Sequence, residues 1–136
     1  MTKTRQVAAL PIRKTEDGSI RVLLVTSRET RRYVIPKGWP WPGHKDHKAA
    51  AREAREEAGI IGKPSKKSIG EYTYAKRRPE GSVPVTVKVF LLEVVKELES
   101  WPEQHERKRI WLTPTKAAEK VAEPELARII SKLEAA

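Results

Sequence analysis

The feature that most constrains this chain is an alanine- and glutamate-rich segment that ends at Gly59. Residues 45–58, KDHKAAAREAREEA, hold five alanines and many good helix formers, with no glycine or proline inside. Asp46 near the start suits the helix dipole, and Gly59 follows the last helical residue, where a left-handed cap is usual. The pattern therefore predicts a helix over residues 45–58.

The carboxylates of this predicted helix share one face. At about 100° per residue, Glu56 and Glu57 lie on either side of Glu53 within little more than one turn. The small side chains that would let the helix sit close against a sheet cluster on another face: Ala50, Ala51, Ala54 and Ala58. We expect the carboxylates to point toward a cleft or toward solvent.

Three neighbouring carboxylates repel one another unless positive charge lies among them. Hard oxygen ligands suit Mg²⁺ or Mn²⁺, which share their coordination with waters and substrate phosphates. Arg52 and Arg55 flank the cluster and are able to orient it. The alternative is a solvated helix face with intrahelical Glu–Arg pairs.

The rest of the chain predicts a single α+β domain over residues 1–136 with a mixed sheet. A turn signal at Asp17-Gly18-Ser19 joins the first two apolar runs into a hairpin. The predicted strands are 7–12, 20–27, 33–35, 69–77, 83–95 and 109–112. The predicted helices after them are 114–121 and 124–133, each opening near a proline.

Composition narrows the possible partners. With 28 Lys plus Arg against 18 Asp plus Glu, the net charge is +10, which favours anionic partners such as polyphosphates, nucleic acid or anionic lipid. The chain has no cysteine, which excludes disulfides, thiolate zinc sites and cysteine nucleophiles. It shows no membrane-length apolar run and no signal-peptide block, so we expect no membrane partner and a cytoplasmic location.

The segment from Gly38 to Ile60 resembles the Nudix box, G-x5-E-x7-R-E-U-x-E-E-x-G-U, where U is aliphatic. Gly38, Arg52, Glu53, Glu56, Glu57, Gly59 and Ile60 stand at the matching positions. The resemblance implies an α/β/α sandwich with a loop-helix-loop catalytic element, and metal-dependent hydrolysis of a phosphoanhydride. It implies Glu53, Glu56 and Glu57 as ligands of Mg²⁺ or Mn²⁺. Glu53 or Glu56 would help to activate water, and Arg52 would orient Glu53.

The chain departs from the box at two positions. Ala54 is a small occupant of the first aliphatic position, and His44 stands where the box has its first glutamate. In the family that glutamate mainly assists, pairing with the box arginine or lying near the metal. We expect His44 to have a surface or structural role.

Outside the box, scattered matches are similar to the diphosphoinositol polyphosphate phosphohydrolases and diadenosine polyphosphate hydrolases. The resemblance implies that basic residues at strand ends and in loops hold a heavily phosphorylated ligand. The substrate-binding residues expected on this basis are Lys3, Arg5, Arg28, Lys37, Gly38, Lys108 and Arg109. Ile110 and Trp39-Pro40-Trp41 differ from that subfamily, which weakens this finer assignment.

Three functions remain open from the sequence. The first is a pyrophosphohydrolase acting on a small-molecule polyanion, with Glu103 or Glu106 as a possible extra carboxylate. The second is a hydrolase of smaller nucleotides or capped RNA, with Trp39 or Trp41 stacking on a base. Capped RNA is the only form in which we expect nucleic acid as a partner. The third is a non-catalytic Nudix-like binding module. Loop packing is the expected role of Trp39 and Trp41, and core packing that of Trp111; the sequence does not address oligomeric state.

Overall fold

The computed structural model describes residues 4–28 and 30–134. Within them, eight strands form one sheet and three helices cover it. The strands are β1 (Arg5–Lys14), β2 (Ile20–Thr26), β3 (Tyr33–Val34), β4 (Lys37–Gly38), β5 (Ile60–Pro64), β6 (Gly70–Arg78), β7 (Gly81–Glu97) and β8 (Arg109–Leu112). The helices are α1 (Asp46–Ala58), α2 (Pro114–Lys120) and α3 (Pro124–Ser131).

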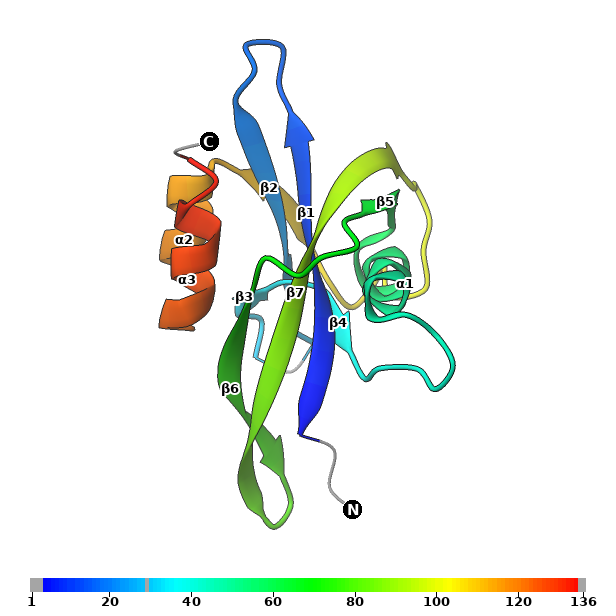
Figure 1. The fold of residues 1–136 in the computed structure, drawn as a ribbon, viewed down its shortest axis with the longest axis vertical. Helices are drawn as coiled ribbons and strands as arrows, with labels where there is room; N and C mark the ends of the chain where they lie inside the picture. The colour runs from blue at the N-terminus through cyan, green and yellow to red at the C-terminus, as the bar shows by residue number, and fades with distance from the viewer. Residues whose placement is uncertain (1–3, 29, 135–136) are drawn as a thin grey trace.

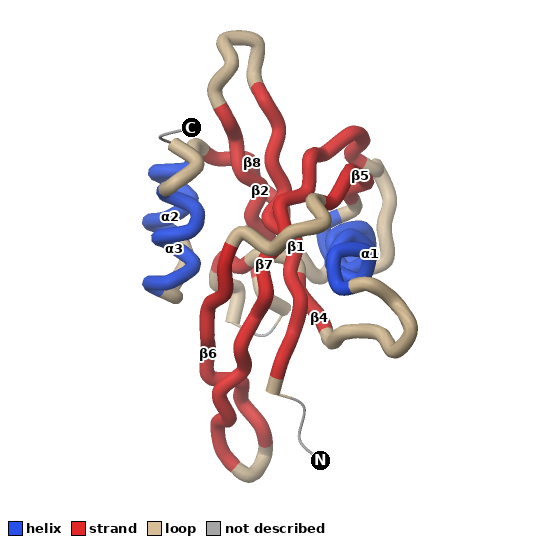
Figure 2. Tube along the Cα trace, viewed as in Figure 1, coloured by secondary structure: helices blue, strands red, loops and turns tan. Residues whose placement is uncertain are grey.

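The elements form three layers, with the sheet between α1 on one face and the α2–α3 pair on the other (Figures 1 and 2). Two apolar clusters hold the layers together. One joins alternate residues of β1, β2 and β7 to Leu126, Ile129 and Ile130 of α3. The other joins the opposite face of the same strands to the alanines of α1. This is the α/β/α sandwich predicted from the sequence.

Strand β7 organises the sheet because its 17 residues contact three partners. Its first part forms an antiparallel hairpin with β6, its middle runs parallel to β1, and its end pairs with β5. The parallel pair among antiparallel ones makes the sheet mixed, as predicted. The predicted shared face of Val83, Val85, Val87, Val89 and Leu91 is confirmed: the three middle valines are buried in the α2–α3 cluster, and Val83 and Leu91 pack against it, partly buried.

The predicted helix is confirmed over Asp46–Ala58, with Lys45 as its N-cap. Gly59 ends it in the left-handed conformation at φ 64°. The two strands that were not predicted are short: β5 begins directly after this cap, and β4 has only two residues. Within the described residues, no helix is both long enough and apolar enough to cross a membrane.

Candidate active site

Helix α1 is fixed at its C-terminal end, where its carboxylates lie. The Arg109 guanidinium donates hydrogen bonds to the carbonyl oxygens of Ala58 (2.9 Å) and Gly59 (3.1 Å), and also to Leu98 (2.8 Å). The same guanidinium lies 4.1 Å from the centre of the Trp101 ring, and Trp101 donates to the Glu57 carbonyl at 3.1 Å. The last carbonyls of a helix have no partner within it. Here they accept hydrogen bonds from Trp101, in the loop before β8, and from Arg109, the first residue of β8.

Glu53 and Glu57 form a carboxyl pair on the inner side of α1. A hydrogen bond between the two side chains lowers the pKa of Glu53, against the larger effect of its burial. Burial raises the pKa of Glu57 to about 8, and burial also raises the pKa of Glu53. Gly38 lies against this pair, because a Cβ at that position would overlap the Glu53 carboxyl group.

Glu57 is more enclosed than the sequence predicted, with only 7% of its surface exposed. Glu57 lies beside the positively charged residues Arg107 and Lys37 and does not face solvent. Arg107 Nη2 is 3.8 Å from Glu57 Oε1, and the Lys37 backbone N–H donates to the same oxygen at 3.4 Å. The positive charges of Arg107 and Lys37 oppose the effect of burial on the Glu57 pKa.

Arg107 links the helix to the loop that follows β7. Besides approaching Glu57, it donates from Nε to Glu103 Oε1 at 2.6 Å and from Nη1 to the Thr26 carbonyl at 3.1 Å. Its side chain is only 10% exposed. Arg107 was not among the predicted site residues, although it belongs to the basic run of residues 107–109. The loop also brings Glu103 close enough to contribute to the raised pKa of Glu57.

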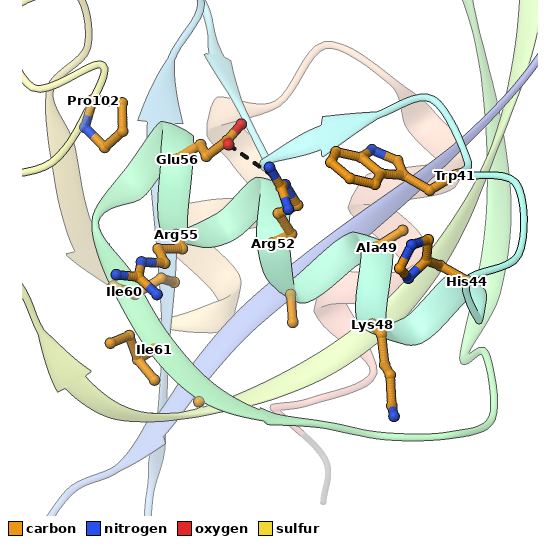
Figure 3. A pocket seen from close by; sticks show the side chains of 12 residues that line it. Trp41, His44, Lys48, Ala49, Arg52, Arg55, Glu56, Ile60, Ile61 and Pro102 are labelled. Carbon is orange, nitrogen blue, oxygen red and sulfur yellow. Dashed lines mark ion pairs between the residues drawn. The ribbon is translucent and has the colours of Figure 1, made fainter.

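Glu56 lies beside the carboxyl pair, toward the outer side of the helix, and its charge helps to raise the pKa of Glu53. It forms an ion pair with Arg52 at 3.5 Å, and the Arg52 guanidinium stacks 3.8 Å from the centre of the Trp41 ring. These residues line a groove of about 500 Å³ with His44, Ile61 and Pro102 (Figure 3). The Glu–Arg pair considered as an alternative in the sequence is therefore present, but for Glu56 only.

Within residues 4–28 and 30–134, no three His, Asp or Glu side chains are already arranged as a metal site. Their chemistry nevertheless fits a hard divalent cation. Glu53 and Glu57 lie within hydrogen-bonding reach of each other, so one small cation is able to contact both carboxyl groups. Glu56 is three residues from Glu53 on the same helix, and its charge helps to raise the pKa of Glu53, so it lies close enough to join the set while Arg52 contacts its Oε1.

The predicted substrate-binding residues fall into different parts of the molecule. Lys37 and Gly38 border the carboxyl pair, and Lys37 Nζ lies 5.0 Å from the centre of the Tyr74 ring. Burial lowers the pKa of Lys37, and the negative charges of Glu57 and Glu123 oppose this lowering. The Arg28 guanidinium lies 3.9 Å from Glu103 and 3.7 Å from Glu106, at the edge of the same region.

The other predicted basic residues are not gathered there. Arg5 pairs with Asp46 at 3.5 Å, at the opposite end of α1 from Glu57. Lys108 is exposed, and its backbone N–H donates to Thr26 Oγ1. Arg109 caps α1 and points its donors at backbone carbonyls, a structural role that the sequence did not predict. Lys3 lies outside the described residues.

Other expectations concern the histidine and the tryptophans. His44 is exposed and meets Trp41 edge-on, with ring centres 5.6 Å apart, which agrees with a surface role. Trp39 is half-buried against the α2–α3 cluster, with Lys76 Nζ 5.8 Å from its ring. Trp111 packs, half-buried, against the α1 cluster, and Arg13 covers its ring.

Comparison with known proteins identifies the family. The NUDIX domain family matches residues 2–133, so the chain belongs to it. Nudix hydrolase 17, mitochondrial, of Arabidopsis thaliana is 33% identical over 74% of this chain and 53% of its own length. The chain thus spans about half the length of that relative.

Solved structures share the fold. A C. elegans Ap4A hydrolase superposes with a TM-score of 0.71 at 23% identity, covering 98% of both chains. A NUDIX hydrolase from Nitrosomonas europaea superposes with a TM-score of 0.73 at 20% identity, covering 98% of this chain and 90% of the other.

Proposed function

We propose that this chain is a Mg²⁺- or Mn²⁺-dependent pyrophosphohydrolase that cleaves a phosphoanhydride bond in a polyanionic small molecule. The observation that carries the proposal is the Glu53–Glu57 carboxyl pair, held against Gly38 and bordered by Arg107 and Lys37. Buried acids placed next to fixed cations are typical of sites that bind a metal together with phosphate. Membership of the NUDIX domain family supports the same reaction class.

Each residue has a distinct part in this proposal. Glu53, Glu56 and Glu57 would hold the divalent cation, which neutralises phosphate charge and lowers the pKa of a bound water. Glu53 or Glu56 would accept a proton as the water oxygen attacks phosphorus and the bridging P–O bond breaks. Arg107 would keep Glu57 and Glu103 in place and offer a guanidinium to the phosphate oxygens.

The charges around the site favour a substrate with several phosphates. Lys37 and Arg107 border the carboxyl pair, and Arg28 lies beside Glu103 in the loop after β7. The chain as a whole has a net charge of +10. Diphosphoinositol and diadenosine polyphosphates fit this character, and one structural neighbour is described as an Ap4A hydrolase. Trp41 is already stacked on Arg52, which lowers the support for the alternative in which it stacks on a nucleobase.

A substrate screen tests the proposal. Diphosphoinositol polyphosphates, diadenosine polyphosphates, nucleoside triphosphates and nucleoside diphosphate sugars are incubated with Mg²⁺ or Mn²⁺, and phosphate and pyrophosphate release is followed. We expect turnover of the first two classes and none in excess chelator. Glu57→Gln should lower kcat/KM on the order of 100-fold, or about 2.7 kcal/mol in barrier height.

The matched control is Glu119→Gln, which neutralises an exposed glutamate of α2 on the other side of the sheet. It should keep full activity. Full turnover in chelator, or equal activity of Glu57→Gln and Glu119→Gln, would overturn the proposed mechanism. Preference for nucleoside triphosphates over both polyphosphate classes would overturn the proposed substrate class.

A further inference from the structure

The further inference concerns the outer side of α1, where three side chains lie in a row. Trp41, Arg52 and Glu56 follow one another along the groove, and Figure 3 marks the ion pair that ends the row. Trp41 comes from the loop before the helix, whereas Arg52 and Glu56 are one helical turn apart. The row therefore connects the loop to one of the three carboxylates assigned above to metal binding.

The ion pair alone would not hold Glu56 in one orientation. Arg52 is 52% exposed and Glu56 is 40% exposed, and an ion pair between two flexible, solvated side chains contributes little by itself. The indole ring changes this because its face holds the planar guanidinium 3.8 Å from the ring centre. An arginine held flat on a ring loses most of its alternative orientations, so its Nε stays directed at Glu56.

Apart from its stack on Arg52, Trp41 contributes little to the packing of the described residues. It is 36% exposed, belongs to neither core cluster, and contacts His44 edge-on beside the stack. The turn that holds its loop is closed by backbone atoms, with the His44 N–H donating to the Trp41 carbonyl at 3.0 Å. Replacing the ring should therefore leave both the core and the loop path unchanged.

We propose that Trp41 is a positioning residue that orients Arg52 and, through Arg52, sets Glu56 for the reaction at the carboxylate site. This inference rests on the proposed function, because it assumes that Glu56 serves a metal-dependent hydrolysis. It assigns the groove in Figure 3 to the support of a carboxylate, and its lining residues are not expected to bind substrate.

The test compares Trp41→Leu with Trp41→Phe. Leucine keeps an apolar side chain without a ring, whereas phenylalanine retains a ring face. Since groups that orient metal ligands typically affect affinity or activity roughly 10- to 100-fold, we expect Trp41→Leu to lower kcat about tenfold and Mn²⁺ affinity to a similar degree. KM and the melting temperature should stay unchanged, and Trp41→Phe should restore most of both losses.

Two further measurements separate positioning from other roles. In wild type, the ring current of Trp41 should shift the NMR signal of the Arg52 Nε–H upfield, and Trp41→Leu should abolish this shift. In an Arg52→Ala background, Trp41→Leu should cause no additional loss, because the two residues act in one chain of contacts. Ile61→Ala is the matched control, since it removes another exposed apolar side chain of the groove and should stay within twofold of wild type.

A raised KM with unchanged kcat and unchanged Mn²⁺ affinity in Trp41→Leu would overturn the inference and assign Trp41 to substrate binding. Additive losses for Trp41→Leu and Arg52→Ala would also overturn it. If wild type hydrolyses no phosphoanhydride while Trp41→Leu still weakens Mn²⁺ binding, the proposed function fails and the positioning role stands.

Discussion

At the scale of single residues, Arg107 joins Glu57 of α1 to Glu103 of the loop after β7. The basic run of residues 107–109 was a visible signal, and Lys108 and Arg109 were predicted to contact substrate. The structure separates the three residues: Arg107 reaches Glu57, Lys108 faces solvent and Arg109 caps α1. Consecutive residues at the start of a strand point in different directions. Only the tertiary contacts show which of the three meets the carboxylates.

Replacing Arg107 by glutamine should damage both catalysis and the folded state. Arg107 supplies the first of the charges that oppose the raised pKa of Glu57, so its loss should raise that pKa further. It would also leave Glu103 without its 2.6 Å hydrogen bond, a loss of about 1–3 kcal/mol for a partly buried charged group. We expect lower kcat/KM and a lower melting temperature, measured against Lys108→Gln.

Lys108→Gln removes the adjacent positive charge, whose side chain is exposed, and should leave both quantities near their wild-type values. Equal effects of the two substitutions would show that only net charge matters here. The specific bridge between Glu57 and Glu103 would then have no measurable part in activity or stability.

At the scale of elements, the helix was predictable and its surroundings were not. Composition, the Gly59 cap and the alanine face all indicated α1, and its observed bounds agree to within one residue of the prediction. Strand β5 was missed because five residues directly after a helix cap show too little alternation to indicate a strand. The capping by Arg109 and Trp101 was also invisible, since both residues are distant from α1 in sequence.

Gly59→Ala tests how closely α1 is held at this end. The residue has φ 64°, and an added Cβ would overlap the Trp101 ring, so backbone strain and a steric clash combine. Each strained position of this kind costs about 1–3 kcal/mol, and the clash adds to it. We expect a larger loss in the free energy of unfolding, measured by urea denaturation, than for a glycine that has strain alone.

Gly18→Ala provides that comparison, because Gly18 has φ 85° and nothing within 4 Å of its added Cβ. If both substitutions lower the free energy of unfolding equally, the Trp101 side chain moves aside without a loss of stability. The close packing around the helix cap would then contribute nothing to stability.

At the scale of the whole molecule, the acidic site should make the stability of the metal-free protein depend on pH. The folded-state pKa of Glu57 is about 8, above the value of 4.5 expected for an ordinary glutamate. The folded protein therefore holds a proton that the unfolded chain releases between these limits. In chelator, this group should lower the free energy of unfolding as pH rises through the window, by up to about 1.4 kcal/mol per pH unit.

Thermal and urea denaturation at several pH values, with wild type and Glu57→Gln side by side, measure this effect. The difference in slope between the two proteins isolates Glu57 from other titrating groups. Mg²⁺ should remove or reverse the wild-type slope, because a bound cation stabilises the charged carboxylates. Identical slopes for both proteins in chelator would show that Glu57 does not hold its proton in the folded state.

The parallel pairing of β1 with β7 also sets the order in which the chain is able to fold. Partners in this pairing, such as Arg5 and Thr86, are 81 positions apart, so β1 has no parallel neighbour until most of the chain has been made. Helix α1 is synthesised earlier, and its alanine face then has only part of the surface that will cover it. Non-local strand pairing of this kind slows folding. Helix α1 therefore precedes its own support during synthesis, and its carboxylates reach their final arrangement only when β7 and the loop after it have joined the sheet.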